Sequence, residues 1–307
     1  MNLKSTRDGF GEAIFELAKS ESKLVVVSAD LKSSTRVEKF AQNFPKRFFE
    51  VGVAEQNLIG VAAGLAMSGK IVFATSFACF SPAINWAQIR QTICYNNLNV
   101  KIVGSHAGLA TGADGATHQA LEDIALTTVL PKMTVVAPAD YNQTKEAVAI
   151  LTKIKGPAYL RLTRPPTIGL NQVDFSPEEK NFVLGVPQKI KSGEKLTLVG
   201  FGPILPEVLF KIPVKKLAKM EVFNCHSLKP FEAKPILNSI KKTGKLVCLE
   251  DHQKIGGLGT LLASQIVKSG IKTKFVHLGV DDKFGCSAKN FRNLWKKYIL
   301  DSLDQLL

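Results

Sequence analysis

The stretch that decides the fold is residues 100–119, VKIVGSHAGLATGADGATHQ. It begins with a β-branched apolar run, Val100 to Gly104, which is typical of a buried strand. The segment from Gly104 to Gln119 has four glycines, so the backbone there can turn sharply and approach a ligand. The loop also carries His106, Asp114 and His118. Because α/β sheets bind ligands at the carboxyl ends of their parallel strands, we interpret this loop as a candidate site.

The rest of the first half repeats this alternation of short apolar runs and helical patterns. Strands separated by helices of this length predict a mostly parallel sheet with helices on both faces. The expected strands are 24–28, 71–74, 100–104, 134–138 and 158–162, and the expected helices are 8–20, 55–67, 82–96 and 141–153.

A second alternating unit follows a stretch that is rich in proline and glycine and has little periodicity. Its expected strands are 196–200, 220–223, 245–249 and 274–278, and its helices lie near 203–210, 234–242, 257–269 and 287–299. The aperiodic stretch predicts a linker that packs on the surface. We therefore expect an α/β protein with two domains, each a mostly parallel sheet with helices on both faces: residues 1–170, a linker at 171–194, and a second domain at 195–307.

Composition excludes several classes of protein. The 307 residues are 45% hydrophobic and 21% charged, unlike a disordered chain, a collagen-like fibre or a disulfide-stapled mini-protein. No apolar run approaches the roughly 18 residues that cross a bilayer. The first residues also lack the apolar segment of a secretory signal. We expect a soluble cytoplasmic protein that does not bind membranes.

Neither the charge pattern nor the cysteine spacing indicates a nucleic-acid site or a metal site. The formal charge is +14, from 40 basic and 26 acidic residues. The lysines are scattered and no aromatic residues alternate with them, which favours solvated helix surfaces over nucleic-acid binding. The five cysteines are dispersed and form no cluster with the five histidines. This pattern predicts buried thiols and no metal ligands from this chain alone.

Two further segments carry candidate chemistry. Residues 52–66, GVAEQNLIGVAAGLA, read as a loop entering a helix with a small apolar face, so Glu55 is expected to be buried and to need a hydrogen-bond partner. The alternative interpretation is that Glu55 stands at the start of the helix only because the helix dipole stabilises a carboxylate there. Phe77 and Phe80 follow a strand; aromatics at this spacing are more often core than a slot for a flat ligand.

Together these segments resemble the pyrimidine-binding and C-terminal domains of the transketolase family, over essentially the whole chain. The motifs occur in the family's order, which makes the set specific. They are Glu55-Gln56-Asn57, Phe77-x-x-Phe80, Gly104-Ser105-His106, Asp114 to Gln119, Leu162 to Pro165, Glu250-Asp251-His252 with Gly256 to Gly259, and His277 to Val280 with Phe284-Gly285.

The resemblance implies thiamine diphosphate as cofactor and the transfer of a two-carbon ketol unit between sugar phosphates. In this family the aminopyrimidine of the cofactor deprotonates the thiazolium ring, and a carboxylic acid on the pyrimidine nitrogen favours the required tautomer. Glu55 matches that glutamate. Phe77 and Phe80 match aromatic residues that stack on the pyrimidine, and Asp30 matches an aspartate near the cofactor.

The residues that bind substrate in the family also have matches in this sequence. His106 and His118 match histidines that line the substrate channel, and Asp114 matches an aspartate that binds a sugar hydroxyl. Arg164 resembles the arginine that grips the substrate phosphate, and Arg7 with Ser34 is expected to complete that site. A guanidinium suits phosphate because it donates two parallel charge-assisted hydrogen bonds. The alternatives are that Arg7 caps a helix and that Ser34 only turns a loop.

One departure from the family pattern shapes the expected assembly. Complete transketolases begin with a domain carrying Gly-Asp-Gly and, about 30 residues later, an asparagine, which hold the magnesium diphosphate. Here the nearest match, Ala113-Asp114-Gly115 with Asn142, lacks the first glycine and belongs to the Ala-Thr-His-Gln loop. Magnesium needs hard oxygen ligands. We therefore expect those ligands on a separate diphosphate-binding subunit, with this chain as the second subunit of a split transketolase in an α2β2 assembly.

Three other functions remain open on the sequence. Deoxyxylulose-phosphate synthase shares part of the pattern, although Gly104-Ser105-His106 and residues 88–90 look closer to transketolase. The beta subunit of a 2-oxo-acid dehydrogenase has the same architecture, but it should lack Thr117-His118-Gln119. A non-catalytic assembly subunit is the alternative from another class, and the intact Glu55 and Asp114 argue against it.

Overall fold

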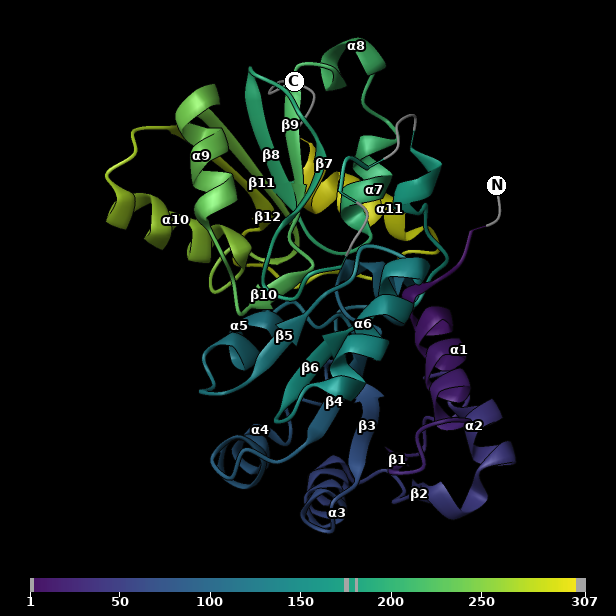
Figure 1. The fold of residues 1–307 in the computed structure, drawn as a ribbon. Coiled ribbons are helices and arrows are strands. Elements are labelled where there is room, and N and C mark those ends of the chain that lie inside the picture. The colour runs from purple at the N-terminus through teal and green to yellow at the C-terminus, as the bar shows by residue number, and fades with distance from the viewer. Residues whose placement is uncertain (1–2, 174–176, 180–181, 302–307) are drawn as a thin grey trace.

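The computed structural model describes residues 3–173, 177–179 and 182–301. Its elements form two sheets, one above the other in Figure 1, each with helices packed on both faces. The expected α/β class with two mostly parallel sheets is confirmed. Residues 1–2, 174–176, 180–181 and 302–307, which include parts of the expected domains and linker, lie outside the described residues.

The first sheet has seven strands in the order β10-β5-β6-β4-β3-β1-β2. All its neighbouring strands are parallel except β10, which runs antiparallel to β5. The strands are β1 Leu24–Ser28, β2 Phe48–Glu50, β3 Ile71–Phe77, β4 Val100–Ser105, β5 Thr134–Val136, β6 Ala158–Arg161 and β10 Ser227–Lys229.

Alternating side chains of these strands pack on two different groups of helices. Leu24 and Val26 face a core formed with α1 and α6, whereas Val25 and Val27 face a core formed with α3. This division follows from the two-residue period of a strand. The helices are α1 Thr6–Ala18, α2 Glu38–Asn43, α3 Glu55–Met67, α4 Trp86–Gln88, α5 Asp123–Thr128 and α6 Tyr141–Lys153, with the shorter turns η1 Pro45–Arg47, η2 Ile89–Cys94, η3 Leu109–Asp114 and η4 Leu170–Gln172.

The second sheet has five strands in the order β12-β11-β8-β9-β7, and only β7 is antiparallel to its neighbour. Its strands are β7 Gln188–Lys191, β8 Leu196–Gly200, β9 Met220–Asn224, β11 Lys245–Gln253 and β12 Lys274–Val280. Its helices are α7 Ile204–Leu209, α8 Val214–Leu217, α9 Lys234–Thr243, α10 Leu258–Ser269 and α11 Phe291–Trp295, continued by η5 Lys296–Leu300.

The structure differs from the expected boundaries in three places. The expected linker at 171–194 contains β7, which adds an edge strand to the second sheet. β10 comes from the second domain but extends the first sheet, where Ser227 pairs with Val136. The helix expected at 82–96 begins at Trp86, and from Ile89 it is wound as a π-helix. Each difference depends on long-range pairing or packing, which local periodicity does not report.

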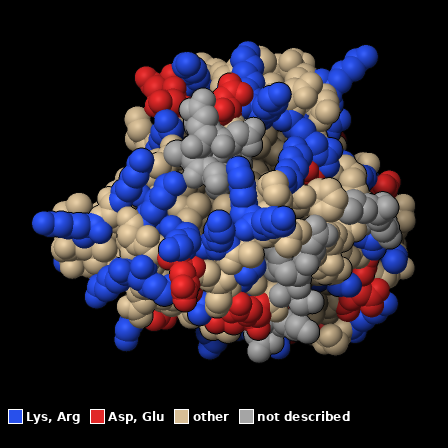
Figure 2. Space-filling view, turned by 90° about the horizontal axis from the view of Figure 1, so that it is seen from above, with Lys and Arg blue, Asp and Glu red and all other residues tan. Residues whose placement is uncertain are grey.

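The distribution of charged side chains and the helices themselves match what the composition predicts. Figure 2 shows lysine and arginine side chains spread widely over the face seen from above, with acidic side chains among them. Within the described part of the chain, none of the helices is both long and apolar enough to span a membrane.

Candidate functional site

Glu55 is held at the start of α3 with its side chain buried. The residue is 7% exposed, and its carboxylate accepts a hydrogen bond at 3.0 Å from the hydroxyl of Ser76 on β3. Asn85 donates to the backbone oxygen of Glu55 at 2.8 Å. The expected burial and hydrogen-bond partner of Glu55 are therefore confirmed. Sequence reasoning missed Ser76 and Asn85, which lie 21 and 30 residues away with no motif to mark them.

Four aromatic rings gather where β3 and β4 end. The rings of Phe77 and Phe80 are nearly parallel, with centroids 6.0 Å apart. The ring of His106 stacks on Phe77 with a centroid distance of 3.8 Å. His118 presents its edge to both phenylalanines, at 6.3 Å from Phe77 and 5.6 Å from Phe80. Ser76, which donates to Glu55, directly precedes Phe77 on β3, so the Glu55 carboxylate and the ring cluster are linked through two successive residues of one strand.

His106 is held in one tautomer and stays neutral. It is 2% exposed, and its Nε2 lies 3.5 Å from an Nη atom of Arg7. A guanidinium can only donate, so Nε2 accepts and Nδ1 donates to the hydroxyl of Ser105 at 2.9 Å. Burial, and then the charge of Arg7, lowers the pKa of His106 to about 3. Its backbone has φ 59°, an unfavourable region for a residue with a side chain.

The loop between His106 and Gln119, here called the site loop, brings Asp114 to Arg164. The two side chains form an ion pair at 3.2 Å and are 31% and 40% exposed. Arg164 also donates to the backbone oxygen of Thr111 at 3.2 Å. The hydroxyl of Thr111 in turn donates to the backbone oxygen of His106 at 2.5 Å. Thr111 was missed by the motif comparison, although it lies inside the quoted loop.

A second arginine lies beside this group. Arg7 is the second residue of α1, whose cap is Ser5, so Arg7 does not cap the helix. It donates to the backbone oxygen of Ser34 at 3.0 Å. Burial, and then the nearby charge of Arg36, lowers the pKa of Arg7 to about 10, and Arg164 adds to that effect. Clustered guanidinium groups repel one another, so an anion bound between them would be stabilised.

Asp30 is also a predicted site residue, but its described contacts do not connect it with these groups. It lies in the loop after β1 and is exposed, with φ 57°. Its backbone N–H donates to the Glu50 carboxylate at 2.7 Å. The predicted roles of Asp30 and of the Ser34 hydroxyl remain predictions.

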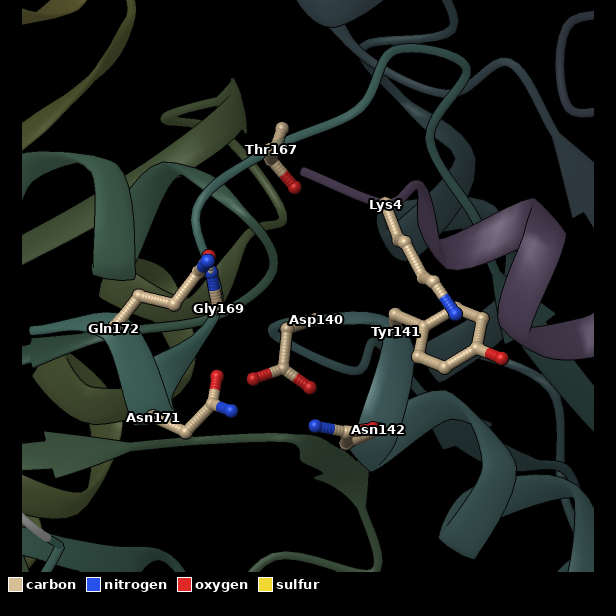
Figure 3. A pocket seen from close by; sticks show the side chains of 8 residues that line it. All are labelled: Lys4, Asp140, Tyr141, Asn142, Thr167, Gly169, Asn171 and Gln172. Carbon is tan, nitrogen blue, oxygen red and sulfur yellow. Dashed lines mark hydrogen bonds between the residues drawn. The ribbon is translucent and has the colours of Figure 1, made fainter. Parts of the chain in front are cut away.

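A small polar cavity has Lys4 and Thr167 in its lining. It has a volume of about 230 Å³ and is lined by Lys4, Asp140, Tyr141, Asn142, Thr167, Gly169, Asn171 and Gln172, whose side chains Figure 3 shows. Lys4 and Thr167 pair as an antiparallel bridge, three residues before Arg7 and three after Arg164. The cavity is separate from the ring cluster, which sits at the ends of β3 and β4.

One group of side chains has ligand atoms close enough for a metal ion. Among the described residues it is Cys248, Glu250 and His277 in the second domain. Glu250 is fully buried and accepts from the backbone N–H groups of Leu258 and Gly259 at the start of α10, at 2.7 and 3.2 Å, and it also pairs with His277. Its oxygens therefore have a structural role already. All five cysteines are free, and Cys94, Cys225 and Cys248 are buried.

Comparison with known proteins places the chain in a family. The model of the transketolase pyrimidine-binding domain matches residues 3–167, and that of the transketolase C-terminal domain matches residues 185–302. The chain is 42% identical over 300 residues to a protein of Methanocaldococcus jannaschii described as a transketolase C-terminal section, covering 97% of this chain and 93% of that protein.

Two further relatives agree. The chain is 35% identical to a 6-deoxy-6-sulfo-D-fructose transketolase subunit of Clostridium sp. (strain MSTE9), covering 92% of this chain and 91% of that protein. A solved structure described as a split gene transketolase, inactive beta4 tetramer, superposes with a TM-score of 0.84 at 40% identity, covering 96% of this chain and 93% of that one. The chain therefore belongs to the transketolase family and carries that family's pyrimidine-binding and C-terminal domains.

Proposed function

We propose that the chain is the pyrimidine-binding subunit of a two-subunit, thiamine-diphosphate-dependent transketolase that moves a two-carbon ketol unit between sugar phosphates. The observation that carries this proposal is how a buried carboxylate, a cluster of rings and two arginines are linked in the fold. The buried Glu55 carboxylate accepts from Ser76, the residue before Phe77 of the ring cluster. In that cluster His106 stacks on Phe77 and contacts Arg7, whose guanidinium also feels the charge of Arg164. These groups come from five separate segments.

The residues present fit the pyrimidine half of the cofactor. Glu55 is a buried carboxyl group whose only described side-chain partner is one hydroxyl, so it retains capacity for a hydrogen bond to a ring nitrogen. One face of Phe77 is covered by His106, which leaves the partly exposed Phe80 as the ring for stacking. Bound thiamine diphosphate would supply the carbanion chemistry, and Glu55 would hold the proton on the pyrimidine nitrogen.

The polar side of the site suits a phosphorylated sugar. Arg7 and Arg164 supply two guanidinium groups for the phosphate. The neutral His106 can accept a hydrogen bond at Nε2 without adding charge. Asp114, already paired with Arg164, would bind a sugar hydroxyl, and His118 would lie between sugar and cofactor. We also propose that the reaction takes place in the cytoplasm.

A partner subunit is the second part of the proposal. We propose that it supplies the magnesium ligands and the diphosphate site, in an α2β2 complex. The relatives that match this chain over at least nine tenths of their length are described as a C-terminal section, a subunit and a split-gene product. The outer side of α3 supports this, because Gly60 and Gly64 have open space where a Cβ would lie and Met67 is 76% exposed.

Reconstitution tests both parts. The chain is mixed with a diphosphate-binding transketolase subunit, thiamine diphosphate and Mg²⁺, and transfer from xylulose 5-phosphate to ribose 5-phosphate is measured. Glu55→Gln should lower kcat by about 100- to 10,000-fold, the range for losing a proton-transfer group. Glu38→Gln is the matched control, because Glu38 also begins a helix but is exposed.

Three results would contradict the proposal. Wild-type rates in the Glu55→Gln complex would remove Glu55 from the chemistry and favour an assembly role for the chain. Full turnover by the chain alone would contradict the need for a partner. Faster reaction with pyruvate and glyceraldehyde 3-phosphate than with the pentose phosphates would point to a deoxyxylulose-phosphate synthase.

A further inference from the structure

A buried carboxylate of the second domain holds the site loop of the first. Asp251 lies on β11 and is 3% exposed. Its Oδ1 accepts from the backbone N–H of Leu109 at 2.9 Å, and its Oδ2 accepts from that of Ala110 at 3.3 Å. These are the first residues of η3, whose N–H groups have no partner inside the turn. Asp251 therefore satisfies two buried donors across the domain boundary.

The backbone of the loop is shaped to admit this carboxylate. Gly108 has φ 78°, and a Cβ there would lie 2.2 Å from Oδ2 of Asp251. The absence of a side chain at 108 lets the carboxylate approach the start of η3. From the other side, Arg161 of β6 donates to the backbone oxygen of Asp251 at 2.8 Å. Asp251 is thus held in place by the first domain while it holds that domain's loop.

Two more contacts attach the far part of the loop to the second domain. The hydroxyl of Ser287 donates to the backbone oxygen of Ala113 at 2.7 Å. The side-chain amide of Gln119 donates to the backbone oxygen of Cys286 at 2.9 Å. Along the chain, Asp114 and His118 lie between these two contacts and follow the Asp251 contacts. Their position relative to Glu55 and Arg164 therefore depends on the second domain.

We propose that Asp251 is a positioning residue: through the N–H groups of Leu109 and Ala110 it sets where the site loop presents Asp114 and His118, with Ser287 as a second, weaker support. The functional consequence rests on the proposed transketolase activity, because Asp114 and His118 are the groups assigned to the sugar there. Asp251 itself is buried and is not among the groups proposed to bind substrate or cofactor. The second domain would thereby act directly on substrate binding.

The first test measures backbone hydrogen exchange in the chain itself and needs no activity. Asp251→Asn replaces one of the two acceptor oxygens with an NH2 donor, so the N–H group that faces this position loses its acceptor. Exchange at residues 108–114 should then accelerate about tenfold or more. Glu250→Gln is the matched control, since Glu250 is the neighbouring buried carboxylate and accepts two backbone N–H groups at α10. It should accelerate exchange near 258–260 and leave 108–114 unchanged. Unchanged exchange at 108–114 in Asp251→Asn would overturn the proposal.

The second test measures kinetics of the reconstituted complex. Asp251→Asn should lower kcat/KM about 10- to 100-fold, mainly through a higher KM for sugar phosphates, because the loop is displaced rather than a reacting group lost. Glu250→Gln should leave that KM unchanged even where it lowers stability similarly. Equal kinetic effects of the two variants would mean a merely structural role and would overturn the proposal.

The two tests also separate this inference from the proposed function. A wild-type complex without transketolase activity would refute the proposed function, while the exchange data would still decide whether Asp251 holds the loop. Should Asp251→Asn not fold, Ser287→Ala decides, because Ser287 is exposed. That variant should raise exchange at 113–116 and raise KM about 2- to 10-fold. No change in either quantity would overturn the proposal.

Discussion

Removing the carboxylate of Asp123 should destabilise the chain more than any surface change. Asp123 accepts from Nε of Arg161 at 2.9 Å and from the hydroxyl of Tyr159 at 2.7 Å. The side chains of Arg161 and Asp123 are 3% and 1% exposed. Asp123→Ala leaves a buried guanidinium without this counter-charge and a buried hydroxyl without its acceptor. Breaking a buried pair in this way costs about 3–5 kcal/mol, which is a large part of the roughly 5–15 kcal/mol that keeps a domain folded.

The chain contains a matched control for this measurement. Glu12 also pairs with a cation and a tyrosine hydroxyl, Lys145 and Tyr141, but the Lys145 and Glu12 side chains are 40% and 45% exposed. Glu12→Ala should therefore cost no more than about 1 kcal/mol. Urea unfolding followed by circular dichroism, at one protein concentration, gives the free energy of unfolding of each variant. The same loss of free energy in both variants would refute the reasoning that burial decides the worth of this pair.

The remaining predictions concern substrate, backbone and pH. Arg164→Gln should raise KM for phosphorylated substrates about 10- to 100-fold; an unphosphorylated ketol donor, assayed in parallel, should show little change. Gly108→Ala should lower the free energy of unfolding by about 1–3 kcal/mol, measured in urea, because φ is positive and the new Cβ meets Asp251. Burial lowers the pKa of His106 to about 3 and that of His226 to about 4. The unfolded state therefore binds more protons below about pH 6.5, so stability should fall from pH 7 to pH 5 by about 2 kcal/mol for each histidine. Thermal melting of His106→Asn should show a smaller loss over that interval than the wild-type chain, and an unchanged loss would contradict the assignment.

Local pattern predicted much of the fold. The β-branched runs at 24–28 and 196–200 are strands with the predicted bounds, and the helices predicted at 55–67 and 141–153 also match. The two helices are long and the two strands are short runs rich in apolar and β-branched residues, so neighbouring residues contain their signal. The three-residue strands Phe48–Glu50 and Ser227–Lys229 were missed, because so short a segment has no period to detect.

Some residues of the candidate site could also be predicted from the sequence, and others could not. Glu55, the two phenylalanines, the site loop and Arg164 could be named from residue type and motif order. Ser76 and Asn85, which hold Glu55, could not, because a serine and an asparagine at those positions have no local signature. Asp251 lies in the quoted Glu250-Asp251-His252 motif, but its contact with the site loop could not be predicted, because its partners lie 141 and 142 residues away.

The amino-acid sequence by itself determined where strands and helices form and which side chains with the required chemistry follow the strands. Hydrophobic period, glycine content and motif order are properties of neighbouring residues, and they persist whatever the rest of the chain does. Only the tertiary structure decided that β10 joins the first sheet, that His106 is a neutral acceptor for Arg7, and that a carboxylate of the second domain caps a loop of the first. The physical reason is that burial, hydrogen-bond satisfaction and pKa depend on groups brought together from distant parts of the chain, and such contacts exist only after folding.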